Sequence, residues 1–168
     1  QFLDDLPEHK RGLFNITGPQ GVGKSWFLSE FAKSARLRGY AVWSIRTRPA
    51  LRSRVFGALA EAQPPAENLP PPGAGDRALI LGLQKMLADR APAGLLLAVD
   101  NLADLDRASL DLLWRVLFAP EISVVALAYT AAPDSPHRPP PLEAPLQASV
   151  ELRPLTPLSI QLWLRTAL

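Results

Sequence analysis

Hydrophobic residues follow two patterns along this chain, and the patterns predict strands and helices that alternate. Short, continuous apolar runs indicate strands that are covered on both faces. Longer segments with apolar residues three or four positions apart indicate amphipathic helices. The predicted strands cover residues 13–17, 40–45, 94–100, 122–129 and 148–152. The predicted helices cover residues 24–37, 50–62, 76–90, a segment that begins at Asp106 or Ser109, and 158–164.

The order of these elements predicts the fold class. Strands that alternate with helices favour an α/β domain, in which a five-stranded parallel sheet carries helices on both faces. Two proline-rich stretches, at about 63–75 and 133–145, interrupt the pattern and are expected to be loops. With 168 residues, the whole segment 1–168 is expected to form a single domain.

Two of the predicted helices have recognisable buried faces. Asp76 is expected to cap the first of them, and its buried face is expected to hold Leu79, Leu83, Met86 and Leu87. The helix after Asp106 is expected to bury Leu110, Leu113, Trp114 and Leu117.

Composition excludes several classes of protein. The chain has no cysteine, so disulfide bonds, thiolate zinc sites and cysteine nucleophiles are excluded. Because no apolar run approaches the ~20 residues that cross a bilayer, and no signal peptide is visible, we expect a cytoplasmic protein without a membrane contact. The chain starts at Gln1 and stops inside a predicted helix. We therefore expect a fragment of a longer protein, whose flanking domains are its partners.

Charge is concentrated in one segment. Residues 31–60 contain seven basic side chains and no acidic one, and the rest of the chain is net acidic. Such a segment can contact nucleic acid or an acidic partner. A solvated face, or a surface that docks a missing domain, is the simpler interpretation, because the segment matches no known nucleic-acid reading motif.

A glycine-rich motif lies between the first predicted strand and the first predicted helix. It matches the phosphate-binding pattern G-x-x-x-x-G-K-[ST] and comprises Gly18, Pro19, Gln20, Gly21, Val22, Gly23, Lys24 and Ser25. A strand before the motif and a helix after it are the context that a phosphate-binding loop requires. The alternative is a glycine-rich turn before an ordinary helix.

The residue types in this motif suit a nucleoside triphosphate. The glycines let successive N–H groups point toward an anion, and the start of the helix adds the positive end of its dipole. Lys24 is expected to reach the β- and γ-phosphates, and the hydroxyl of Ser25 is expected to bind Mg²⁺. Trp26 follows directly, close enough to contact the nucleotide, although tryptophan more often packs in a core.

An acidic residue ends the apolar run at 94–100. Asp100 is expected to hold Mg²⁺ through a water molecule, because Mg²⁺ gives up its waters reluctantly. The alternative is an aspartate that simply ends a strand and meets solvent. The glycine-rich motif favours the metal-linked role, because an ATP-binding chain needs both parts.

The whole chain resembles the ATPase core of STAND-type signalling NTPases, and especially large ATP-dependent transcriptional regulators of bacteria. The matching segments are residues 17–25, 95–110 and 124–129. The resemblance implies the three-layer sandwich of a P-loop NTPase, of the AAA type, with sheet order 5-1-4-3-2. It also implies a domain that alternates between ADP and ATP states and so switches an output domain.

Two positions depart from the pattern of that family. Where the family has a second acid after the strand, this chain has Asn101, and an amide cannot accept a proton from an attacking water. Asp104 and Asp106 are nearby acids, but Asp106 is expected to cap a helix. At the end of the 122–129 strand, where related regulators place an arginine, the chain has Thr130. Thr130 is either a phosphate sensor or a plain strand terminus.

Three functions remain open on the sequence alone. The leading hypothesis is a regulatory ATP- and ADP-binding switch with slow or absent hydrolysis, in which a second copy of the chain is a further candidate partner on activation. The second is an active ATPase that remodels or loads a partner on DNA. The third is a degenerate NTPase fold that acts as a scaffold.

Overall fold

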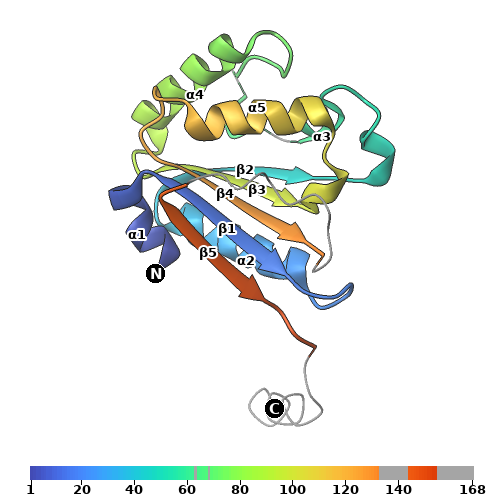
Figure 1. Ribbon diagram of the computed structural model, residues 1–168. Helices are drawn as coiled ribbons and strands as arrows, with labels where there is room; N and C mark the ends of the chain where they lie inside the picture. Colours follow the sequence, from blue (N-terminus) through green and yellow to red (C-terminus); the bar gives the residue numbers. More distant parts are fainter. Residues whose placement is uncertain (63, 68, 133–143, 155–168) are drawn as a thin grey trace.

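A computed structural model describes residues 1–62, 64–67, 69–132 and 144–154 of the chain. Five parallel strands form one sheet in the order β2-β3-β4-β1-β5 (Figure 1). The strands are β1 (Arg11–Thr17), β2 (Tyr40–Arg46), β3 (Gly94–Asp100), β4 (Val125–Ala131) and β5 (Leu146–Glu151). This order is the predicted one, read from the opposite edge, and the P-loop NTPase fold is confirmed.

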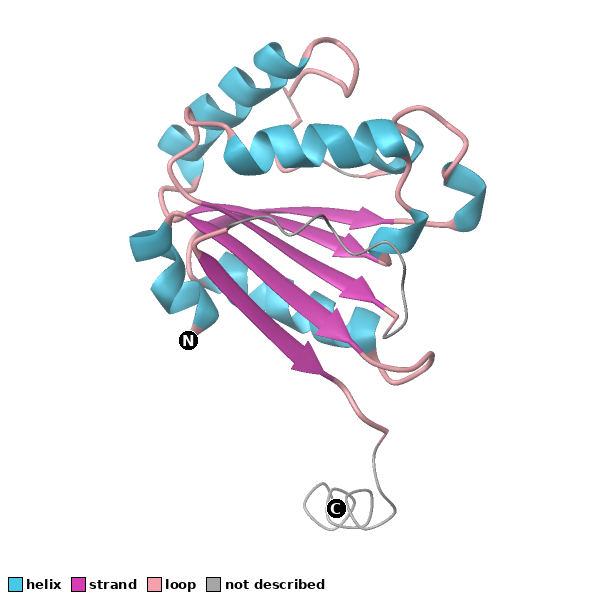
Figure 2. Ribbon diagram, viewed as in Figure 1, coloured by secondary structure: helices cyan, strands magenta, loops and turns pink. Residues whose placement is uncertain are grey.

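Helices cover both faces of the sheet (Figure 2). One face packs against α1 (Phe2–His9) and α2 (Lys24–Leu37). The other packs against α3 (Gly57–Glu61), α4 (Asp76–Arg90) and α5 (Arg107–Phe118). Two short 3-10 helices, η1 (Pro49–Leu51) and η2 (Leu102–Asp104), follow β2 and β3. All seven residues of β4 and the first six of β3 are buried, as expected for central strands covered on both sides.

Several predicted elements match the structure closely, and their buried faces are the expected ones. Helices 24–37 and 76–90 and strand 94–100 have the predicted limits. In α4 the buried residues are Leu79, Leu83, Met86 and Leu87. In α5, Leu113 and Leu117 are buried, whereas Leu110 and Trp114 are partly buried against the same core. The prediction for residues 158–164 lies outside the described residues, as does most of the loop at 133–145.

Other predictions were wrong in ways that have physical reasons. The helix at 50–62 is replaced by η1 and the short α3, because Phe56 takes a left-handed conformation (φ 55°) just before α3. Gly75, not Asp76, is the N-cap of α4, and Asp76 instead pairs with Arg115 of α5. The chain also forms α1, which the sequence did not predict, since Pro7 interrupts its pattern.

The strand at 122–129 is shifted along the chain. It begins at Val125 and runs to Ala131, because the turn before it is held by Arg11 of β1. The Arg11 guanidinium donates to four carbonyl oxygens at 2.7–2.9 Å, those of Lys10, Ala119, Ile122 and Ser123. Residues 119–123 therefore form a turn rather than the start of a strand.

Candidate functional site

The phosphate-binding motif forms the connection between β1 and α2, at the carboxyl ends of the strands (Figure 1). Gly18 is buried against the segment that follows β5, and a Cβ placed on it would lie 2.5 Å from the carbonyl oxygen of Leu152. Gly23 is the N-cap of α2 with φ 99°, a left-handed conformation that favours glycine. The loop therefore requires glycine at both positions. A side chain at position 18 would collide with the backbone of Leu152, and one at position 23 would strain the left-handed backbone.

Lys24 folds over this loop. Its Nζ donates to the carbonyl oxygens of Gly18 and Pro19, at 2.7 and 2.8 Å. An ammonium group has three hydrogens, so one donor remains for a phosphate oxygen. The donor set fits a nucleotide phosphate: a positively charged amine, the first N–H groups of α2 and a loop of small residues.

Asp100, at the end of β3, is hydrogen-bonded to one residue of α2 and one residue of β4. Its Oδ1 accepts hydrogen bonds from the hydroxyl of Ser25, at 3.0 Å, and from the hydroxyl of Thr130, at 2.8 Å. Ser25 belongs to α2, Asp100 ends β3 and Thr130 lies in β4. The described residues contain no group of three or more histidine, cysteine, aspartate or glutamate side chains placed to hold a metal ion. Ser25 and Asp100 present oxygen atoms, the ligands that Mg²⁺ prefers, and would hold the ion together with water.

Thr130 occupies a different place from the predicted one. It lies inside β4 rather than after its end, and it is 1% exposed. Its Oγ1 also accepts a 2.6 Å hydrogen bond from the backbone N–H of Asn101. The hydroxyl thus links the end of β3 to the next residue along the chain.

Asn101 turns the chain out of β3. It has a left-handed backbone conformation (φ 63°, ψ 73°), which asparagine tolerates better than most residues. Its side-chain amide donates to Oδ2 of Asp104 at 2.5 Å. Asp104 is also 3.7 Å from the guanidinium of Arg52, and its side chain is 14% exposed. The nearest acid after Asp100 is thus held by an amide and a cation.

Residues 1–125 match the protein family described as AAA ATPase domain. The chain belongs to that family. No curated protein matches the sequence. The matched region includes the phosphate loop and Asp100, whereas Thr130 and β5 follow it. This AAA domain is accordingly a P-loop NTPase that binds a nucleotide, and members of the family usually bind it with Mg²⁺.

Asp106 serves the AAA domain as a structural residue. It is 3% exposed and caps α5. Its carboxylate accepts four hydrogen bonds, from the N–H and hydroxyl of Ser109 and from the N–H groups of Phe56 and Ala58. Burial alone would raise the pKa of Asp106, but these hydrogen bonds outweigh it and hold the pKa below its usual value. The expected helix cap is confirmed, and the cap also anchors the start of α3.

Thr47, directly after β2, contacts the site of the AAA domain although sequence reasoning missed it. Its Oγ1 is 2.8 Å from the carbonyl oxygen of Asp100 and 2.6 Å from that of Asn101. The signal was indirect: the implied sheet order places the end of β2 beside the end of β3, where a hydroxyl residue can bond the exiting chain.

Trp26 is the third residue of α2 and is 69% exposed. It is not a core residue of the AAA domain. Contact between its indole and a nucleotide stays a prediction.

None of the described helices has the length and hydrophobicity that crossing a bilayer requires.

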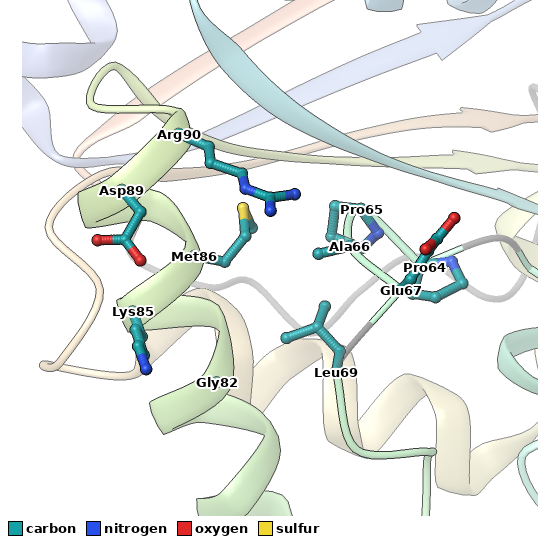
Figure 3. Close-up of a pocket in the computed structure, with 10 residues that line it drawn as sticks. All are labelled: Pro64, Pro65, Ala66, Glu67, Leu69, Gly82, Lys85, Met86, Asp89 and Arg90. Carbon is teal, nitrogen blue, oxygen red and sulfur yellow. The ribbon is translucent and has the colours of Figure 1, made fainter.

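A cavity of about 710 Å³ lies away from the phosphate loop of the AAA domain. Figure 3 shows it between α4, which contributes Met86, Lys85 and Arg90, and the segment that includes Pro65 and Leu69. No predicted site residue lines it. The candidate nucleotide site is therefore defined by the carboxyl ends of β1, β3 and β4 and not by this cavity.

Proposed function

We propose that this AAA domain is the ATP-binding switch of a cytoplasmic STAND-type regulator, with slow or absent ATP hydrolysis. The observation that carries the proposal is the arrangement at the end of β3. Asp100 shares its Oδ1 between the hydroxyls of Ser25 and Thr130, while the next residue is Asn101. Ser25 and Asp100 supply the oxygen atoms proposed for the metal, whereas the position that would activate water holds an amide.

The contacts of Asn101 support slow hydrolysis. An amide cannot remove a proton from water as a carboxylate does, and here the amide is engaged with Asp104. The carboxylate of Asp104 also forms an ion pair with the Arg52 guanidinium, at 3.7 Å. Neither residue is thus free to act as a general base.

A switch that hydrolyses ATP slowly acts by population shift. Bound ATP and bound ADP would favour different arrangements of the flanking domains, such as a transcriptional output domain. Each nucleotide can shift the equilibrium between two arrangements only by the difference between its affinities for them. Association with a second copy of the chain on activation is part of the same proposal.

Titration calorimetry with Mg·ATP and Mg·ADP tests the binding half of this proposal. Binding is expected, and Lys24→Ala is expected to weaken it by about ten- to a hundredfold, because a charged hydrogen bond to phosphate is lost. A folded parent chain that binds neither nucleotide would instead support the scaffold hypothesis.

Turnover measurements test the hydrolytic half. The parent is expected to hydrolyse Mg·ATP more slowly than about 1 s⁻¹, the lower end of ordinary enzymes. Asn101→Asp restores a carboxylate of the same size at a position whose left-handed backbone aspartate also tolerates. That variant is expected to be faster, and a variant no faster than the parent contradicts the role given to Asn101.

One observation favours the second hypothesis, an active ATPase that works on DNA. The basic segment contacts the candidate site through two residues. The hydroxyl oxygen of Thr47 lies 2.8 Å from the carbonyl oxygen of Asp100 and 2.6 Å from that of Asn101, and Arg52 pairs with Asp104. A polyanion on this segment would therefore act on the end of β3. Salt-sensitive stimulation of turnover by DNA would favour this hypothesis over the switch.

A further inference from the structure

The seven basic residues of segment 31–60 are not equivalent. Five of them form ion pairs with described acids: Lys33 with Glu30, Arg38 with Asp4, Arg52 with Asp104, and both Arg48 and Arg54 with Glu61. Within the described part of the chain, Arg36 and Arg46 form no ion pair. These two are therefore the cations of the segment that have charge left to offer a ligand.

Arg36 and Arg46 line the same cavity, of about 230 Å³, between α2 and β2. On the α2 side the lining residues are three or four positions apart, which places them on one face of the helix: Ser25, Leu28, Ser29, Ala32 and Arg36. On the sheet side, residues two apart share a face: Ser44 and Arg46 of β2, and Ala98 and Asp100 of β3. The two arginines thus approach the cavity from different elements.

The polar groups of this cavity suit an anion at its β2 side. Arg36 is oriented by Ser44, whose hydroxyl oxygen lies 3.4 Å from its Nη2. The hydroxyls of Ser29 and Ser44 are further donors in the lining. Asp100 is the one acid among the described lining residues, and its Oδ1 is already bonded by Ser25 and Thr130.

We propose that this cavity binds a phosphate group, held by the guanidinium groups of Arg36 and Arg46. Guanidinium offers planar pairs of N–H donors that match phosphate oxygens. The volume lies below the ~300–1,000 Å³ of sites for drug-sized ligands, so it fits inorganic phosphate or a small phosphorylated metabolite rather than a nucleotide.

This anion site is distinct from the phosphate loop. No residue of 18–24 lines the cavity, but Ser25 and Asp100 line it and also form the proposed Mg²⁺ site. The phosphate would lie beside the groups that hold the metal, so its binding and nucleotide binding would be coupled reciprocally. The inference goes beyond the proposed switch and does not depend on hydrolysis.

Calorimetric titration with inorganic phosphate at constant ionic strength tests the site. The Lys24→Ala chain is used as the background, because it weakens the phosphate loop as a competing anion site. This chain is expected to bind one phosphate, and adding Arg36→Gln or Arg46→Gln is expected to weaken that binding about tenfold. Arg46→Lys, which keeps the charge but loses the planar fork, is expected to bind more weakly than the parent.

Arg38→Gln is the matched control. Arg38 caps the same helix α2 but bonds Asp4 and Ser34 and lies outside the cavity lining. Phosphate affinity in this variant is expected to be unchanged. If Arg38→Gln weakens phosphate binding as much as Arg36→Gln or Arg46→Gln does, the losses reflect net charge alone and the inference is overturned. Folding of each variant is checked by circular dichroism.

Two further results separate the alternatives. If the folded Lys24→Ala chain binds no phosphate, the inference is wrong, whatever the outcome for ATP. If glycerol phosphate binds more tightly than inorganic phosphate, the occupant is a phosphorylated metabolite. If inorganic phosphate binds more tightly, the occupant is free phosphate. Either result supports a phosphate site in this cavity.

Discussion

Oδ1 of Asp100 accepts a 2.8 Å hydrogen bond from the hydroxyl of Thr130, so the last residue of β3 is fixed by a buried side chain of β4. The oxygen of the same hydroxyl accepts a 2.6 Å hydrogen bond from the backbone N–H of Asn101. A single hydroxyl thus orients the proposed metal-binding carboxylate and satisfies the backbone at the point where the chain leaves the sheet.

Replacing Thr130 with valine is expected to weaken Mg²⁺-dependent ATP binding severalfold. Valine keeps the branched shape inside β4 but removes both hydrogen bonds, and a typical hydrogen bond contributes about 0.5–1.5 kcal/mol. Stability in urea should fall by a similar amount. Mg²⁺ titration at fixed ATP measures the first effect. Thr130→Ser keeps the hydroxyl and is expected to retain Mg²⁺ affinity; equal losses in both variants would contradict the role of the hydroxyl.

Asp106→Asn is expected to destabilise the domain by about 1–3 kcal/mol at pH 7, measured by urea unfolding. A carboxylate accepts all four hydrogen bonds, whereas an amide brings two donors of its own toward other donors. Asp111→Asn, at a half-exposed position on the same helix, is the control, and it should change stability little.

The effect of Asp106→Asn should also depend on pH. The pKa of Asp106 is lower in the folded chain than in the unfolded chain. The stability that the ionised carboxylate contributes to the fold is therefore fully present above the unfolded pKa of about 4. It is lost as pH falls through the folded pKa. The stability difference between parent and variant should therefore be constant from about pH 7 to pH 5 and shrink below about pH 4. A difference that grows on acidification would contradict this assignment.

Arg11→Met is expected to destabilise the domain by about 1.5–3 kcal/mol, the range for hydrogen bonds from a charged group. The variant leaves the carbonyl oxygens of Ala119 and Ile122, and their neighbours in the turn before β4, without the guanidinium. Thermal unfolding measures the loss. Arg77→Met, at an exposed position of α4, is the matched control and should have little effect.

Gly18→Ala is expected to cost more stability and more ATP affinity than Gly21→Ala. Both positions have positive φ angles, of 150° and 79°, so both variants strain the backbone. Only at Gly18 would the new methyl group meet a backbone oxygen, that of Leu152, and overpacking of this kind costs about 1–3 kcal/mol more. Urea unfolding and ATP titration of the two variants provide the comparison. A larger loss in Gly21→Ala would contradict the contact with Leu152.

The parts of the fold that local sequence determines were predictable. Helices 24–37 and 76–90 have regular apolar spacing, and strand 94–100 is a continuous apolar run, so their limits match the structure. The sheet order followed from the family resemblance. The phosphate loop was visible because its chemistry requires fixed residue types in consecutive positions.

The parts that depend on contacts between distant residues were not predictable. Arg11 fixes the start of β4 through residues more than a hundred positions away. Asp106 bonds Phe56 and Ala58 and so shortens the helix predicted at 50–62. Thr47 contacts the candidate site only because β2 and β3 are neighbours. None of these pairings leaves a periodic signal in the sequence.

The place of β1 between β4 and β5 has a consequence for synthesis of the protein. Arg11 pairs with Val125, and Thr17 pairs with both Ala131 and Glu151. The phosphate loop therefore emerges from the ribosome more than a hundred residues before the strands that flank it. Until β4 and β5 have been made, the nascent chain carries the complete motif but not the sheet that shapes it. We therefore expect the phosphate loop to reach its binding conformation only once translation has passed β5.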